Sequence, residues 1–403
     1  MDRLHVFLKK LSSKIYRSLI PFKAYRVRKK KIITVVFVFS RVSMWKNDYL
    51  YQEMVKNDRF NVMIVIVPDL MLKCELSDVI EECEHYLLQK NYQFINPYAP
   101  ESTFSSLKYL KPDIIFYPRP YNAYPDGFRF EDNFGSLFCH SDYGYHTIKE
   151  PFIIDTRYIN HVWQNYYENE SVRSETESAW PHLKNIKVTG LPNTDSFWHP
   201  VESQWKTCLD AKYKIIWAPH FSVEPGWLNY SNFLDLAEEM MTYVKSMGSV
   251  MQFAFKPHPL LKAALYDHPE WGKEKTDAYY YAWASMENTQ LVEGEYIGLF
   301  MHSDAMIHDS SSFRVEYIHA NKPVLFLLKD DCMTGGMYEF GVKALDCHYK
   351  GKTMDDIRKF ISDVVIGRND PMKIRRECFI TEYLLPPNNL TASQNIINAI
   401  LGE

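Results

Sequence analysis

The feature that most constrains this chain is a regular alternation of short apolar runs and helical patterns. The run "KIITVVFVF" at 31–39 is followed by a helical pattern over 44–56 and then by a second apolar run at 60–68. Runs that are apolar at nearly every position indicate strands buried on both faces, and such strands are typical of parallel sheets covered by helices. Further runs lie at 92–96, 112–118 and 136–140. The first part of the chain therefore predicts a doubly wound α/β domain over 31–195.

The same alternation of apolar runs and helical patterns starts again after a change in the sequence pattern near residue 186. A Gly-Leu-Pro turn at 190–192 and the polar segment 196–212 are interpreted as a boundary and a linker. Apolar runs then recur at 214–221, 251–259, 289–294, 304–309 and 323–328. Because 403 residues are too many for one hydrophobic core, we predict two doubly wound domains facing a cleft, the second over 213–403.

Composition narrows the class of protein. A hydrophobic content of 46% and a charged content of 24% are ordinary for a globular chain. The net charge of -4 gives no electrostatic reason to expect a nucleic-acid partner. The seven cysteines are scattered without a CxxC pair, which favours reduced thiols in a cytosolic protein. We expect neither a membrane-spanning helix nor a signal peptide, because the longest apolar runs have the length of strands.

The first 30 residues form a pattern of their own. Apolar residues recur at helical spacing from Leu4 to Leu19, cations fill the other positions, and a basic tract continues to Lys31. A basic amphipathic helix of this kind is typical of proteins that lie on an anionic membrane surface. The alternative is a helix that packs against the protein's own body and leaves its charged face in water.

Three adjacent serines separate a buried strand from a helical pattern. The strand ends in Asp309, and Ser310, Ser311 and Ser312 lead into a helix predicted over 312–320. The first N–H groups of a helix are unpaired, and small hydroxyl side chains add donors and leave room for a phosphate. Since one serine is enough for an ordinary helix cap, three of them favour an anion site.

Lys256 and His258 follow another apolar run, each directly before a proline. The prolines exclude a helix and stiffen the exit from the strand. A lysine and a histidine fixed at this point can hold a diphosphate or protonate a leaving group. Ligands of doubly wound sheets bind outside the carboxyl ends of the strands, which is where this pair and the serine turn both lie.

A third polar stretch, "FCHSDYGYHTIKE" at 138–150, lies at the end of the fifth strand of the first domain, which is predicted over 136–140. It carries His140, Asp142 and His146. A histidine across a cleft from a phosphate site suits the general base for an acceptor hydroxyl, because its pKa lies near neutrality. The alternatives are a surface loop with incidental histidines and a zinc site, although no zinc-binding spacing is present.

These stretches, in this order, resemble the CDP-glycerol glycerophosphotransferase family, the teichoic-acid primases and polymerases. The similarity covers most of the second half, including "VTGLPNTD" (188–195), "IIWAPHF" (215–221), "FKPHP" (255–259) and, most specifically, "SDAMIHDSSSFRVEYIHANKPVLFL" (303–327). The resemblance implies a GT-B-like fold of two Rossmann-type domains. It also implies transfer of a polyol phosphate from a CDP-activated donor to an acceptor hydroxyl at the membrane face.

The resemblance further implies roles for single residues. His258 with Lys256 would meet the donor diphosphate, and Glu316 would reach the ribose or the cytosine. Around the donor phosphates it implies Asp309, Ser310, Ser311 and Ser312. The family's usual His-Gly-Thr-Pro turn is replaced here by "HSDYGYHT", which leaves two candidates for the base, His146 first and His140 second.

The sequence therefore predicts a cytoplasmic, peripheral enzyme on the inner face of the cell membrane that builds a surface glycopolymer such as teichoic acid or a capsule. Its expected partners are a CDP-polyol or other nucleotide-activated donor, a lipid-linked or saccharide acceptor, and an anionic membrane surface, without nucleic acid. No cofactor or metal is required, although Mg²⁺ on the diphosphate is compatible with these residues. The alternatives are a GT-B glycosyltransferase that uses a nucleotide sugar and a non-catalytic assembly scaffold.

Overall fold

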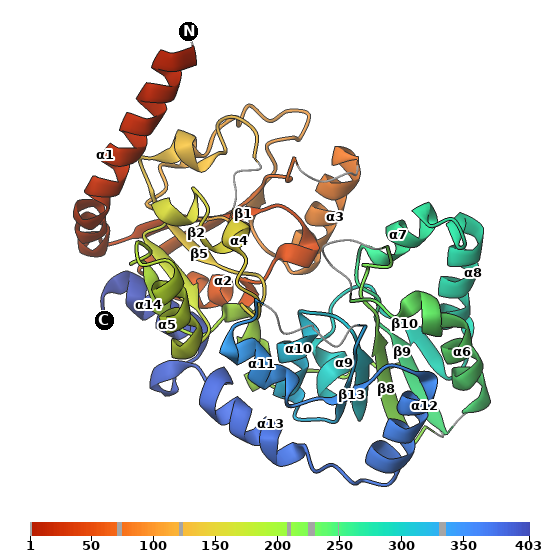
Figure 1. The fold of residues 1–403 in the computed structure, drawn as a ribbon. Coiled ribbons are helices and arrows are strands. Elements are labelled where there is room, and N and C mark those ends of the chain that lie inside the picture. Colours follow the sequence, from red (N-terminus) through yellow and green to blue (C-terminus); the bar gives the residue numbers. More distant parts are fainter. Residues whose placement is uncertain are drawn as a thin grey trace. The chain divides into compact units, whose positions relative to one another are not determined.

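Two fully parallel sheets, one in each of two units, organise the chain (Figure 1). The computed structural model describes residues 2–70, 75–120, 124–207, 211–224, 230–248, 250–329 and 336–403. Unit 1 comprises residues 1–145, 149–195 and 385–403, and unit 2 comprises residues 146–148 and 196–384. The prediction of two Rossmann-type α/β domains is confirmed.

Unit 1 is built on a seven-stranded sheet with the order β3-β2-β1-β4-β5-β6-β7. Its strands are β1 (Ile33–Phe39), β2 (Phe60–Ile66), β3 (Phe94–Ile95), β4 (Ile114–Phe116), β5 (Leu137–Ser141), β6 (Gln164–Tyr167) and β7 (Ile186–Val188). Its helices are α1 (Asp2–Lys29), α2 (Asp48–Val55), α3 (Leu76–Gln89), α4 (Pro151–Ile154), α5 (Glu170–Ala179) and α14 (Ala392–Leu401). Strand β6 was not predicted, because its sequence Gln-Asn-Tyr-Tyr is not an apolar run, yet all four residues are buried.

Unit 2 is built on a six-stranded sheet with the order β10-β9-β8-β11-β12-β13. Its strands are β8 (Tyr213–Ala218), β9 (Met251–Phe255), β10 (Thr289–Leu291), β11 (Ala305–His308), β12 (Val324–Leu327) and β13 (Tyr349–Gly351). Its helices are α6 (Phe233–Ser246), α7 (Leu261–Asp267), α8 (Gly272–Ser285), α9 (Ile297–Met301), α10 (Phe313–Glu316), α11 (Glu339–Leu345), α12 (Met354–Lys359) and α13 (Lys373–Phe379). Each strand from β8 to β12 lies inside an apolar run predicted from the sequence, apart from one residue at the start of β8.

Both faces of the unit 2 sheet are covered, which explains why its central strands β8, β11 and β12 are mostly apolar. Ile215 and Trp217 of β8 pack in one hydrophobic cluster with α6 and α8, whereas Ile216 and Ala218 pack in another with α9. The aromatic segment of α8 belongs to the first cluster, where the ring of Trp283 stacks on Phe255 at 5.1 Å. Side chains that alternate across a strand therefore meet a hydrophobic layer on either side.

The chain is divided differently from the prediction in three places. Residues 385–403, expected in the second domain, belong to unit 1, where α14 packs against α2 and Asp195 accepts hydrogen bonds from the first N–H groups of α14. The predicted linker 196–212 belongs to unit 2, where Trp205 is buried and donates to the Leu299 carbonyl. Residues 146–148 also belong to unit 2, because Ile148 bridges to Met337.

The predicted N-terminal helix is present as α1, and it has two different faces. On one face Tyr16 is buried and stacks on Phe134, Ser13 hydrogen-bonds His161, and Lys23 donates to two backbone carbonyls. The other face leaves a row of large apolar side chains in water: Leu11, Ile15, Leu19, Phe22 and Tyr25. Packing against the body and an exposed apolar stripe are thus properties of the same helix. No helix in the described part of the chain combines the length and apolarity needed to cross a bilayer.

Candidate functional site

The carboxyl ends of β9, β8 and β11 bring polar side chains together in unit 2. These three strands are neighbours in the sheet, so the loops that follow them leave from the same edge. Beyond the strands, the N–H of His258 still donates to the carbonyl of Pro219 at 3.0 Å, which keeps the two loops side by side. We call the group at this edge the edge cluster; it comprises His220, Lys256, His258, Ser310 and Ser312.

Two histidines of the edge cluster have their tautomers set by their partners. Their rings lie 5.1 Å apart. The backbone N–H of Leu260 donates to Nδ1 of His258 at 3.1 Å, and that of Ser222 donates to Nδ1 of His220 at 3.3 Å. A nitrogen that accepts a hydrogen bond carries no proton in the neutral ring, so the proton lies on Nε2 of each histidine. Both rings are therefore neutral N–H donors.

Burial keeps these two rings uncharged near neutral pH. Burial, with a contribution from Arg314, lowers the pKa of His220 to about 4. Burial, His220 and Lys256 together lower the pKa of His258 to about 3. A donor that is uncharged before the ligand arrives can be kept in a buried site beside a lysine at less electrostatic cost than a second cation.

The serine turn supplies hydroxyl groups to the same edge. Oγ of Ser310 and Oγ of Ser312 lie 3.2 Å apart, with Ser310 buried and Ser311 and Ser312 half-buried. The helix that follows is shorter than predicted, because α10 is one turn that passes into a 3-10 helix at Tyr317. The hydroxyl groups, rather than a long helix dipole, are the polar donors that the turn offers.

Asp309 has a different environment from the one expected at the donor phosphates. Its carboxylate accepts the backbone N–H of His220 at 2.6 Å and that of Asn232 at 2.7 Å. It is buried, and burial raises its pKa to about 6. The side chain thereby ties the loop after β8 to the end of β11. This geometry holds the edge cluster together, and a place for Asp309 around the donor phosphates stays a prediction.

Glu316 and Lys256 meet the same tyrosine. The hydroxyl of Tyr296 donates to Oε2 of Glu316 at 2.5 Å, and Nζ of Lys256 lies 5.5 Å from the centre of the Tyr296 ring. Both charged side chains are almost completely buried. The predicted residues of the second domain are thus brought together, with a carboxylate and a cation on either side of one aromatic ring.

His140 lies in unit 1, at the carboxyl end of β5, as the sequence predicts. Its Nδ1 lies 3.1 Å from the carbonyl oxygen of Tyr117, which can only accept, so Nδ1 carries the proton. The neutral ring then has its lone pair on Nε2, the opposite of the two histidines in unit 2. Asp142 is buried close by in the sequence and accepts the N–H of Tyr143.

His146, the other predicted base, does not lie in the first unit. It is half-buried and begins the short segment that belongs to unit 2. The next residue, Thr147, accepts a hydrogen bond from the N–H of Tyr338 at 3.1 Å, and a Cβ at Gly341 would come within 2.5 Å of the Thr147 carbonyl. Backbone pairing of 147–148 is the reason for this placement.

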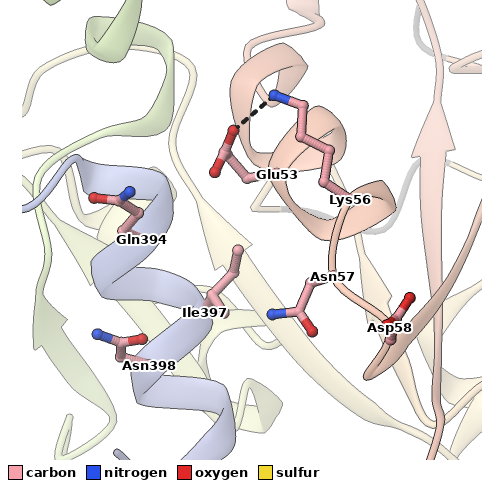
Figure 2. Close-up of a pocket in the computed structure, with 7 residues that line it drawn as sticks. All are labelled: Glu53, Lys56, Asn57, Asp58, Gln394, Ile397 and Asn398. Carbon is pink, nitrogen blue, oxygen red and sulfur yellow. Dashed lines mark hydrogen bonds and ion pairs between the residues drawn. The ribbon is translucent and has the colours of Figure 1, made fainter.

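A hollow of about 490 Å³ in unit 1 is not a candidate for the active site (Figure 2). Its lining includes the ion pair of Lys56 with Glu53 at 3.0 Å, together with Asp58 and Asn398. Asp58 stands two residues before β2 begins, so the hollow lies at the amino end of that strand. Ligands of parallel sheets bind at the opposite edge.

The residue that sequence reasoning missed is His220. The sequence "WAPHF" does place a histidine directly after a buried strand. A single histidine, however, has no spacing to a second polar residue that would distinguish it from the other histidines of the chain. Only the fold shows that His220 lies beside His258, which is distant in the sequence. Across the residues that the structure describes, no group of three or more histidine, cysteine or acidic side chains could hold a metal ion.

Comparison with known proteins identifies a family segment. The model of the CDP-Glycerol:Poly(glycerophosphate) glycerophosphotransferase family matches residues 154–335, which include the whole edge cluster. The resemblance drawn from the sequence is confirmed. Among curated proteins, none matches the chain.

Solved structures show the fold more widely. A histidine variant of the wall teichoic acid polymerase TagF has a TM-score of 0.58 at 14% identity, covering 99% of this chain and 98% of that chain. UDP-GlcNAc 2-epimerase from Neisseria meningitidis, bound to UDP-GlcNAc, has a TM-score of 0.57 at 12% identity, covering 92% and 100%. MnaA from S. aureus with UDP has a TM-score of 0.56 at 12% identity, covering 92% and 96%. The GT-B-like fold is thereby confirmed.

Proposed function

Residues 154–335 carry the sequence of the CDP-glycerol glycerophosphotransferase family, and on this premise we propose that the chain transfers a polyol phosphate from a CDP-activated donor to an acceptor hydroxyl. The observation that carries the proposal is that the matched residues contain every member of the edge cluster, so the family segment and the anion-binding chemistry coincide. A TagF variant has also been soaked with CDPG, which supports a CDP-linked donor for a protein of this fold.

The edge cluster is suited to a diphosphate. His220 and His258 offer Nε2–H groups, Ser310 and Ser312 offer hydroxyls, and Lys256 offers a buried positive charge. Donors that are fixed before the reaction and shielded from water stabilise developing charge on phosphate oxygens more strongly than mobile ones. We assign Glu316, beside Tyr296, to the ribose or the cytosine of the donor.

The acceptor is activated by a histidine in this proposal, with His140 first and His146 as the alternative. The base takes the proton of the acceptor hydroxyl, and the oxygen attacks the β-phosphorus of the donor. A phosphodiester bond forms, the bond from that phosphorus to the bridging oxygen breaks, and CMP leaves with the bridging oxygen. The lone pair on Nε2 of neutral His140 is the group that this step needs.

A glycosyltransferase that uses a nucleotide sugar is the second candidate. It is favoured by the likeness to an epimerase bound to UDP-GlcNAc, whose fold this chain shares. The two reactions differ in the atom that is attacked, which is phosphorus in one and the anomeric carbon in the other. They therefore differ in both products, the nucleotide released and the bond formed.

A donor screen tests the proposal. The purified chain is incubated with CDP-glycerol, CDP-ribitol, UDP-GlcNAc or a GDP-sugar, together with a polyol-phosphate acceptor, and the released nucleotide is quantified. We expect CMP and a ³¹P signal of a new phosphodiester, both abolished in His258→Ala. Release of UDP or GDP with a new glycosidic signal, and no CMP, would reject polyol-phosphate transfer.

We also propose that α1 attaches the chain to the inner face of the cell membrane. The exposed row from Leu11 to Tyr25 is flanked by exposed Lys14, Arg17 and Lys29, which suits insertion of apolar side chains among anionic headgroups. The opposite face of the helix is occupied by its contacts with unit 1.

Vesicle sedimentation tests this attachment. Ile15→Glu and Phe22→Glu should each reduce binding to vesicles that contain anionic lipid, because a charge in the apolar row opposes insertion. Leu88→Glu, which changes an equally exposed leucine on α3, is the matched control and should bind as the original chain does. Equal binding by all four proteins would refute the role of α1.

A further inference from the structure

Arg314 is a fully buried cation directly after the serine turn. It is the second residue of α10 and has no exposed surface. Its guanidinium lies 5.2 Å from the centre of the Phe326 ring, and Nη1 approaches the Met337 sulfur at 3.9 Å. Nε and Nη2 have no hydrogen-bond partner among the described residues. The three N–H groups on these two nitrogens are thus without an acceptor among the described residues.

The polar groups that the described residues place around Arg314 are neutral. Nδ1 of His308 faces the Ser310 carbonyl at 3.1 Å, and Nδ1 of His348 faces the Ala344 carbonyl at 2.8 Å, so both nitrogens carry the proton. Burial lowers the pKa of His348 to about 3 and that of His308 well below its usual value, which leaves both rings uncharged. The hydroxyl of Tyr230 hydrogen-bonds the guanidinium. None of these groups balances a positive charge.

Folding alone gives no reason to retain such a residue. A buried charge without a partner loses its hydration, and an apolar side chain of similar volume in the same place commonly leaves stability unchanged or raises it. Phe326 and Met337 already line the site of Arg314, so a methionine side chain would find apolar neighbours. The charge is therefore retained for something other than packing.

The charge of Arg314 reaches the edge cluster. Ser310 and Ser312 stand four and two residues before it in the chain, and it contributes to the low pKa of His220. We propose that Arg314 is the internal counter-charge of the donor's diphosphate: a guanidinium that meets no carboxylate among the described residues of unit 2, so that its positive charge acts on bound phosphate. The inference rests on the proposed function and adds a residue to the same site.

Arg314 acts behind the turn, so it is a positioning and electrostatic residue rather than a catalytic one. Its effect should grow with the charge of the ligand. In Arg314→Met we expect CDP to bind at least about tenfold more weakly, CMP to lose less, and neutral cytidine to bind unchanged. The reason is that the attraction of a buried positive charge is poorly screened and grows with the charge of the ligand. Arg314→Lys, which keeps the charge, should recover part of the affinity.

Thermal unfolding separates this role from a structural one. Without ligand, Arg314→Met should unfold at the same temperature as the original chain or at a higher one. The matched control is Arg376→Met, because Arg376 is equally buried but forms an ion pair with Asp370. That variant should unfold at a lower temperature and bind CDP unchanged. An unfolding temperature that falls in Arg314→Met while CDP affinity is retained would overturn the proposal.

Inorganic pyrophosphate keeps the test independent of the nucleotide. If the original chain binds pyrophosphate but not CDP, the assignment of the donor fails while the role of Arg314 stands, provided that Arg314→Met loses pyrophosphate. If the original chain binds CDP and Arg314→Met binds both ligands equally well, the proposed function stands and the role of Arg314 is refuted.

Discussion

The carboxyl edges of the two sheets carry histidines of opposite chemistry. In unit 2, backbone N–H groups donate to Nδ1 of His220 and His258, so these rings present N–H groups. In unit 1, a backbone carbonyl faces Nδ1 of His140, so this ring has its lone pair on Nε2. Two sheets of similar topology thus offer a donor edge and an acceptor edge. In the proposed function, this difference divides phosphate binding from proton removal by the choice of backbone group that meets each ring.

The strongest way to break this comparison is to remove a donor from unit 2. We expect His258→Ala to lower kcat/KM by about 10³-fold, since loss of one fixed donor to a charged transition state has effects of that size. His258→Gln should recover part of the loss, because the glutamine amide reaches about as far as Nε2 and donates an N–H. Steady-state kinetics with the CDP-linked donor measure both variants.

The pair of variants decides what His258 does. Equal activity in His258→Gln and His258→Ala would contradict a donor role and point to the ring itself. His85, an exposed histidine on α3, provides the control, and His85→Ala should retain full activity.

Removing the lone pair from unit 1 should have a smaller effect. His140→Phe keeps an aromatic ring beside Tyr158 but has no proton acceptor. We expect kcat to fall by about 10²-fold, the lower range for loss of a general base, with the Kd for CDP unchanged. His146→Phe is tested in parallel. If His146→Phe loses activity and His140→Phe does not, the base lies in the segment that belongs to unit 2, and the division between the two edges is wrong.

Sequence reasoning located the strands and the strand exits because both depend on local patterns. Apolar runs predict buried strands. The serine turn and the Lys-Pro-His-Pro stretch lie directly after such runs. Strand β6 could not be recognised from an apolar run, because it contains Gln and Asn although it is buried. Local pattern therefore predicted most of the strands and most of the residues that meet in the edge cluster.

The parts that could not be predicted depend on contacts between distant residues. Asp309 reads as a phosphate contact in sequence, but its carboxylate meets the N–H groups of His220 and Asn232, 89 and 77 residues away. The return of α14 to unit 1 depends on Asp195, which is almost 200 residues earlier. Tautomers likewise depend on which backbone group faces a ring. No spacing rule contains such information.

The smallest predicted effect is on the stability of the fold at acidic pH, and we expect it to differ between the two units. In unit 2, burial lowers the pKa of His220 to about 4 and that of His258, His319 and His348 to about 3, against 6.5 for an ordinary histidine. Below pH 6.5 the unfolded rings bind protons that the folded rings do not. Stability is therefore lost as pH falls from 6.5 towards 4, by up to about 1.4 kcal/mol per pH unit for each histidine.

Asp309 acts in the opposite sense, because burial raises its pKa to about 6, but one carboxyl opposes five histidines, since burial also lowers the pKa of His308. We expect hydrogen exchange at pH 4.5 to accelerate in the strands of unit 2 before those of unit 1. His348→Gln keeps an N–H for the Ala344 carbonyl and removes one titrating ring, so it should reduce the pH slope by about one fifth of the histidine contribution. Exchange that accelerates equally in both units would show that the buried histidines of unit 2 do not set its acid stability.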